Sequence, residues 1–225
     1  MLRLLNSFIS STLEFFRWPI GLVITIFLPA LAMIFIRALF ILLGNAPQHL
    51  PFFAAFLCYF FFWFWQIRHW KVSWFSTLEH ECTHAITAWA CGCKVVGLRA
   101  TWKKGGACTY QGKTNWLIRL TPYFLPTLCL PIIVVHQFSP LESSLLEGLL
   151  GATLAYHLTS TLRETHKGQT DLSKSGWIFV LSFLPGANLL VYTWLLQQVH
   201  PTQGWLNPIA GQLKFILNQI QRIIS

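Results

Sequence analysis

A short segment at residues 80–84, His-Glu-Cys-Thr-His, carries side chains suited to metal chemistry. On an α-helix, residues four apart project from one face, so His80 and His84 can offer imidazole nitrogens to one ion. Glu81 sits beside the first ligand, where it can reach a water bound to that ion. This HExxH arrangement is typical of zinc hydrolases, in which zinc lowers the pKa of its water and the glutamate takes the proton. We therefore predict one Zn²⁺ ion, with Glu81 as the catalytic base.

The third zinc ligand must come from elsewhere in the chain, because a catalytic zinc takes three protein ligands and leaves the fourth position for water. Asp171 is the only aspartate in the sequence and lies in a basic link before the last long apolar run. We predict Asp171 as this ligand. An isolated aspartate is ordinarily a cap or turn residue, so Glu164, His157 and His166 remain alternatives.

The composition indicates that most of these 225 residues lie in lipid. Hydrophobic residues make up 54% of the chain and charged residues only 10%, against roughly 25% in soluble domains. The net charge of +9 is not that of a nucleic-acid binder, because no polar domain carries the basic residues. They are better explained as topological anchors and contacts for anionic lipid.

Apolar runs long enough to cross a bilayer recur along the chain. Five such runs lie at residues 20–43, 52–67, 116–136, 145–162 and 177–197. An amphipathic helical stretch, residues 70–92, carries the HECTH segment between the second and third runs. Prolines 122, 126 and 131 are expected to kink the third run. The sequence thus predicts an all-α polytopic membrane protein with about five transmembrane helices.

The whole chain, residues 1–225, is predicted to form a single membrane domain with amphipathic ends. Apolar residues of 1–19 share one helical face, as do those of the tail at 198–225, and both fit helices that lie on the bilayer. A partner-binding helix is the alternative. Residues 20–69 supply the two N-terminal transmembrane segments, and residues 70–197 form the core that carries the HECTH segment.

The distribution of basic residues predicts the orientation. The loops at 44–50 and 137–144 contain no Lys or Arg, whereas the N-terminus and the links on the other side are basic. This asymmetry follows the positive-inside rule and places the N-terminus and the HECTH segment on the cytoplasmic side. No feature of the sequence indicates the oligomeric state.

Over residues 70–196 the sequence resembles the site-2 protease family of intramembrane zinc metallopeptidases. The HECTH segment is followed by Gly92 and then by Val95 and Val96, much as family members follow HExxH with a helix, a glycine and a strand. Residues 98–110, with Lys104-Gly105-Gly106 at their centre, resemble the family's membrane-associated β-hairpin. Asp171 corresponds to the family's late aspartate ligand, although Leu172 follows it where the family normally has glycine.

The resemblance implies an intramembrane zinc metalloendopeptidase that cleaves a membrane protein or peptide in or near a transmembrane segment. It also implies a multi-pass protein of a bacterial inner membrane, and the chain is too short for a PDZ-like insertion. An exposed strand of the hairpin would hold an extended substrate by β-addition. A non-proteolytic zinc-binding membrane protein, such as a scaffold or transporter component, is the alternative, and a zinc hydrolase acting on a lipid-linked or other amide is a third.

Four further residues are candidates for substrate binding or for support of the ligands. Gly105 and Gly106 lie at the centre of the hairpin. His157 and Asn188 lie inside apolar runs, where polar side chains are costly unless they are bonded. A plain interhelical hydrogen bond is the alternative role for both.

Overall fold

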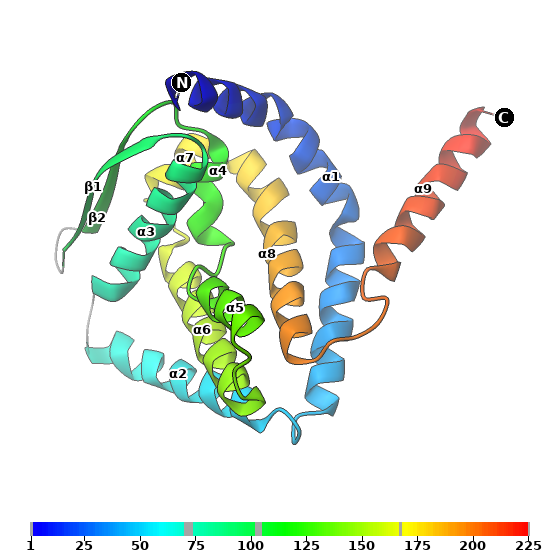
Figure 1. The fold of residues 1–225 in the computed structure, drawn as a ribbon. Helices are drawn as coiled ribbons and strands as arrows, with labels where there is room; N and C mark the ends of the chain where they lie inside the picture. Colours follow the sequence, from blue (N-terminus) through cyan, green and yellow to red (C-terminus); the bar gives the residue numbers. More distant parts are fainter. Residues whose placement is uncertain (1, 70–73, 102–104, 167, 225) are drawn as a thin grey trace.

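The computed structural model describes residues 2–69, 74–101, 105–166 and 168–224 (Figure 1). Within these residues the protein is mostly helical, with one small antiparallel sheet. The elements in chain order are α1 (Leu2–Gly44), α2 (Leu50–His69), α3 (Trp74–Ala90), β1 (Lys94–Thr101), β2 (Gly105–Gln111), α4 (Trp116–Leu120), the 3-10 turn η1 (Thr121–Tyr123), α5 (Cys129–Phe138), α6 (Ser143–Glu164), α7 (Thr170–Ser175), α8 (Trp177–Val199) and α9 (Asn207–Ile224).

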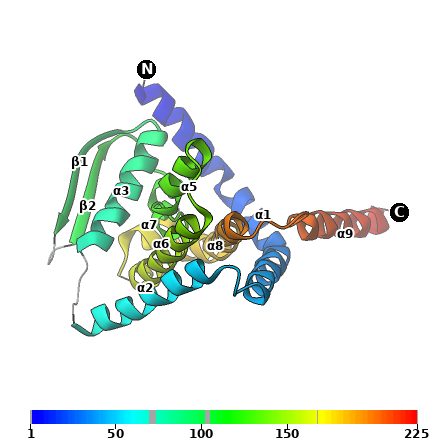
Figure 2. The same ribbon diagram turned by 60° about the horizontal axis from the view of Figure 1, so that its bottom comes forward.

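The predicted HECTH helix and hairpin are both present. The HECTH segment lies on α3, and β1 and β2 pair in an antiparallel register from Lys94 opposite Gln111 to Thr101 opposite Gly105. The sheet packs along α3, as Figure 2 shows. Residues 70–73, where the helix was expected to begin, and Lys104, which was expected at the centre of the hairpin, lie outside the described residues.

The prediction of one kinked helix over residues 116–136 is wrong. The chain there forms the short helix α4, the turn η1 and an irregular stretch before α5 begins at Cys129. Pro122 and Pro126 account for the break, because proline lacks the backbone N–H that helix continuation needs and its ring clashes with the preceding turn. This break matters for the site, since α4 and η1 both contact α3.

Two helices among the described residues are long and apolar enough to cross a membrane, and they pack against each other: residues 3–44 of α1 and the whole of α8. The apolar stretches Leu50–Gln66 of α2 and Cys129–Phe138 of α5 are shorter. In Figure 1, α2 runs crosswise to α1. The count of five transmembrane helices therefore stays a prediction. The predicted interfacial segment 1–19 is continuous with the first apolar run, in the single helix α1.

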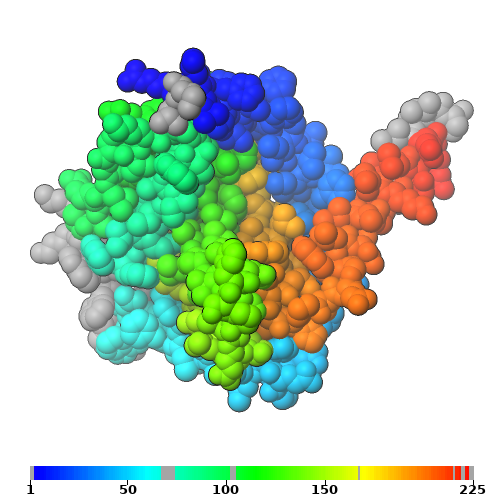
Figure 3. All heavy atoms as spheres, viewed as in Figure 1, coloured from blue at the N-terminus to red at the C-terminus, as the bar shows by residue number. Residues whose placement is uncertain are grey.

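The C-terminal tail forms the predicted helix, α9, which stands away from the rest of the protein (Figures 1 and 3). It is attached to α1 through Gln212, whose side chain accepts a hydrogen bond from the N–H of Ala30 and donates one to the carbonyl of Ile26. These two backbone groups flank Pro29, which lies inside α1. A side-chain amide thus bonds to α1 beside its internal proline.

Candidate active site

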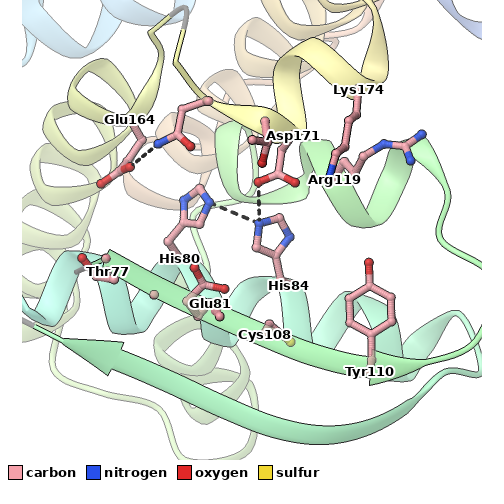
Figure 4. A pocket seen from close by; sticks show the side chains of 15 residues that line it. Thr77, His80, Glu81, His84, Cys108, Tyr110, Arg119, Glu164, Asp171 and Lys174 are labelled. Atoms are coloured by element: carbon pink, nitrogen blue, oxygen red, sulfur yellow. Dashed lines mark hydrogen bonds and ion pairs between the residues drawn. The ribbon is translucent and has the colours of Figure 1, made fainter.

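The helix α3 places both histidines on one buried face. The Nε2 atoms of His80 and His84 lie 3.2 Å apart, and the two residues are 9% and 7% exposed. Asp171, in the first turn of α7, approaches from the other side, with its Oδ2 atom 3.3 Å from Nε2 of His84. One potential ligand atom from each of the three residues lies within 4.8 Å of the others (Figure 4).

This arrangement fits the donor set of a catalytic zinc ion. Two imidazoles and a carboxylate are ligands that zinc favours, and three protein ligands leave one position for water. Ligand atoms about 2.0 Å from a tetrahedral ion lie roughly 3.3 Å from each other, close to the separations at His84. The three residues therefore suit one Zn²⁺ ion.

The orientation of His84 is set by the backbone of α4. Nδ1 of His84 lies 2.7 Å from the carbonyl oxygen of Ile118, so the ring donates its Nδ1–H there and keeps Nε2 for an ion. Ile118 is fully buried, and its own N–H donates to the side chain of Asn115, which caps α4. The cap of α4 thus helps to hold the carbonyl that orients His84.

The protonation states of two of the ligands, His80 and Asp171, also suit metal binding. Burial lowers the pKa of His80 to about 3, and the neighbouring His84 acts in the same direction, so the ring stays neutral and keeps a lone pair. Burial alone would raise the pKa of Asp171, but its hydrogen bond and charge interaction with His84 outweigh that effect and lower it. The carboxyl group is therefore ionised at neutral pH.

The three residues open onto a cleft of about 530 Å³ between α3, β2, α4 and α7. Glu81 lines this cleft beside the histidines, and its carboxylate accepts a hydrogen bond from the backbone of Cys108 in β2. Gly105 and Gly106 also line the cleft. A Cβ atom at Gly106 would lie 2.5 Å from Cγ of Glu81, so only glycine lets the strand approach the glutamate this closely.

The alternatives for the third ligand lie in other surroundings. Glu164 lines the cleft, but its Oε2 atom accepts a hydrogen bond of 2.8 Å from Gln169. His166 is exposed and accepts the N–H of Gly168. His157 is 2% exposed inside α6 and does not line the cleft. Among the described residues, the one group of three possible ligands combines His80, His84 and Asp171.

Asn188 contacts the site indirectly, through Tyr123. Its amide donates to the carbonyl oxygen of Tyr123 in η1 at 3.1 Å. The Tyr123 ring packs edge-on against His80, with the ring centres 5.3 Å apart. Asn188 therefore contributes through the turn that carries Tyr123, and the structure does not place it in the cleft.

Several cleft residues carry no signal in the sequence. They come from four elements and the connection before α7, and they meet only in the folded chain: Thr77, Cys108, Tyr110, Arg119, Gln169 and Lys174. Figure 4 shows Arg119 and Lys174 on the same side of the cleft as Asp171. The contact of His84 with the Ile118 carbonyl could not be predicted from the sequence either, because any residue type at position 118 would provide that backbone carbonyl.

Comparison with known proteins gives one finding for this chain. A protein-family model described as Peptidase M50B-like matches residues 52–212. No curated protein and no solved structure matches. The matched residues begin in α2 and end in α9, so they include every residue that lines the cleft.

Proposed function

The chain belongs to the Peptidase M50B-like family, the site-2 protease group of metallopeptidases, and we propose that it is an intramembrane zinc metalloprotease. The observation that carries the proposal is the meeting of His80, His84 and Asp171 within 4.8 Å at the floor of a cleft lined by Glu81. Replacing Glu81 by glutamine, with zinc content and proteolysis measured together, tests it.

The proposed chemistry is hydrolysis of a peptide bond. A bound zinc ion would polarise the scissile carbonyl and acidify the attacking water. Glu81 accepts the proton from that water and returns it to the leaving amine. The hydrogen bond from the Cys108 backbone holds the carboxylate of Glu81 in the cleft. Because three residues form the ligand group, a position stays open for water, which favours a catalytic over a structural zinc site.

The strand β2 supports a role in substrate binding. It lines the cleft from Gly105 to Tyr110, and within the described residues it pairs only with β1, so its other edge has no strand partner. A peptide bond in a helix is shielded by its own hydrogen bonds, so we propose that a membrane protein or peptide is first locally extended. It would then add to this edge through backbone hydrogen bonds.

The substitution Gly106→Ala tests the close approach of β2 to Glu81. The added Cβ would clash with Cγ of Glu81 and with Cγ2 of Thr77, at 2.5 and 2.7 Å, so the strand or the carboxylate must move. Because a displacement of about 1 Å can cost 10²-fold, we expect kcat/KM to fall by roughly that factor with zinc content unchanged.

Gly97→Ala in β1 is the matched control for this substitution. Its added Cβ would meet Thr109 at an ordinary 3.8 Å, so activity should stay at the wild-type level. Equal activity of Gly106→Ala and Gly97→Ala would contradict the proposed position of β2 over the catalytic base.

The setting we propose is a bacterial inner membrane, with the N-terminus and the cleft on the cytoplasmic side. Family membership and the two long apolar helices fit insertion into a lipid bilayer. The orientation rests on the charge asymmetry of the loops. Apolar side chains exposed along the first half of α1 fit contact with lipid: Leu4, Leu5, Phe8, Phe15 and Phe16.

Reporter fusions at Gln48 and Lys103 test this orientation. Gln48 lies in the connection between α1 and α2, and Lys103 falls between β1 and β2. We expect a periplasmic reporter, such as an alkaline phosphatase, to be active at Gln48 and inactive at Lys103. A cytoplasmic reporter should behave in the opposite way. The same activity pattern at both positions would contradict the proposed orientation.

A further inference from the structure

A second pair of histidines lies at the end of the molecule opposite the cleft. His49 immediately precedes α2 and His200 immediately follows α8, so the two meet only in the fold (Figure 1). Nε2 of His49 is 2.9 Å from Nδ1 of His200, and Nδ1 of His49 is 2.9 Å from Oε1 of Glu147 in the second turn of α6. Two connections and the beginning of α6 thus contribute one polar cluster.

The cluster is partly shielded from solvent, and one of its carboxylate oxygens has no hydrogen-bond partner. His49 is 8% exposed, and the side chain of Glu147 is 13% exposed. The Oε2 atom of Glu147 is buried and makes no hydrogen bond. Buried carboxylate oxygens normally have a hydrogen-bond or cation partner, since leaving one unpaired costs free energy. A positive charge on the far side of the His49 ring, such as a metal ion, would offset part of this cost through the imidazole that Glu147 contacts.

The geometry of the pair resembles that of the histidines in the cleft. The two facing ring nitrogens are 2.9 Å apart here and 3.2 Å apart at His80 and His84. Two nitrogens bound to one tetrahedral ion lie roughly 3.3 Å apart. Rotations of the two rings that separate the nitrogens by a few tenths of an ångström would therefore admit an ion between His49 and His200.

Glu147 provides the outer contact that metal-binding histidines usually have. By accepting the Nδ1–H of His49, its carboxylate leaves Nε2 of that ring with a lone pair directed at His200. Imidazole ligands favour zinc and the neighbouring transition metals over magnesium or calcium. The elements of a small metal site are therefore present, independently of the cleft.

We propose that His49 and His200 form a second binding site for a divalent transition metal such as Zn²⁺, with Glu147 orienting His49 and water completing the coordination. In the proposed orientation this site faces away from the cytoplasm. A bound ion would fasten the α1–α2 connection to the end of α8 and the start of α6. These four helices enclose an apolar hollow of about 470 Å³, so the ion would stabilise the walls of that hollow.

Zinc stoichiometry of the full-length protein tests this proposal. Wild type and the double substitution His49→Asn/His200→Asn are equilibrated with ZnCl₂, freed of excess metal and measured for zinc and protein. We expect the double variant to hold one zinc ion fewer per chain. The expected difference of one ion does not depend on the cleft. If the cleft binds no zinc, the wild type should hold one ion, at His49 and His200, and the double variant should hold none. Equal zinc content in the two proteins would overturn the proposal.

His136→Asn is the matched control, because it also removes a histidine, one whose Nδ1 atom already accepts the N–H of Leu141. Its zinc content should equal that of the wild type, and a loss equal to that of the double variant would overturn the assignment. The single substitution His200→Asn replaces a half-buried side chain and serves if the double variant does not fold. It too should lose one zinc ion, and wild-type content would contradict the site.

Glu147→Gln separates a metal site from a plain hydrogen-bonded chain. Glutamine can still accept the Nδ1–H of His49 but brings no charge, so zinc affinity at this site should fall by about 10- to 100-fold. Isothermal titration with ZnCl₂ in a His84→Ala background, which disables the cleft, measures that affinity. An affinity for zinc unchanged by Glu147→Gln and by His200→Asn would contradict the proposal.

Discussion

Glu81→Gln is expected to lower peptide hydrolysis by about 10³-fold while zinc content stays at the wild-type level. Glutamine has nearly the same shape as glutamate but cannot accept a proton, and general base catalysis is worth roughly 10²- to 10⁴-fold. The three ligand residues are left intact, so metal binding should persist. Cleavage of a transmembrane peptide by purified protein gives the rate, and elemental analysis gives the zinc content.

The matched control for this variant is Glu79→Gln, which changes the neighbouring acid on α3. Glu79 does not line the cleft, and its Oε1 atom accepts a hydrogen bond from the hydroxyl of Thr83, which a glutamine carbonyl can also accept. Its activity should stay near the wild-type level. Unaltered proteolysis in Glu81→Gln would rule out the proposed mechanism, whatever the zinc content.

Asp171→Ala is expected to release the zinc ion and with it all activity. The carboxylate is 3.3 Å from Nε2 of His84, where it would be the third ligand. Outer-shell partners of a metal site contribute 10- to 100-fold in affinity, so loss of a direct ligand should exceed about 100-fold. Competition with a zinc chelator of known affinity measures the change, and residual proteolysis is followed in the same samples.

Glu164→Ala is the control that decides between the two carboxylates of the cleft. Glu164 is held by the amide of Gln169 and lies outside the ligand group, so its removal should leave zinc affinity near that of the wild type. Full zinc loading in Asp171→Ala, together with loss of zinc in Glu164→Ala, would transfer the role of third ligand to Glu164.

Local features of this protein were predictable from the sequence because they depend on short spacings. The positions of His80 and His84 follow from the 3.6-residue period of a helix, which brings residues four apart onto one face. The hairpin followed from the resemblance at residues 98–110, and the structure confirms it. The apolar composition indicated a lipid environment, and two helices are long and apolar enough to fit one.

The break at residues 116–136 shows where reading an apolar run fails. Hydropathy measures which solvent a segment prefers, and it does not register that prolines interrupt the helical hydrogen bonds. The three prolines were visible in the sequence but were read as kinks, because membrane helices tolerate proline. Whether the helix kinks or breaks depends instead on packing. Here α4 and η1 pack against α3, so the carbonyl of Ile118 contacts His84 and the ring of Tyr123 contacts His80.

The sequence by itself determined that a pair of histidines with an adjacent glutamate would face one side of a helix in a largely apolar chain. The tertiary structure alone decided that Asp171, and none of the other three candidates for the third ligand, meets His84, that Gly106 lies against Glu81, and that His49 meets His200. These contacts join residues distant in the chain. A sequence period describes one element at a time, whereas the packing of several elements determines which loops and strands lie together.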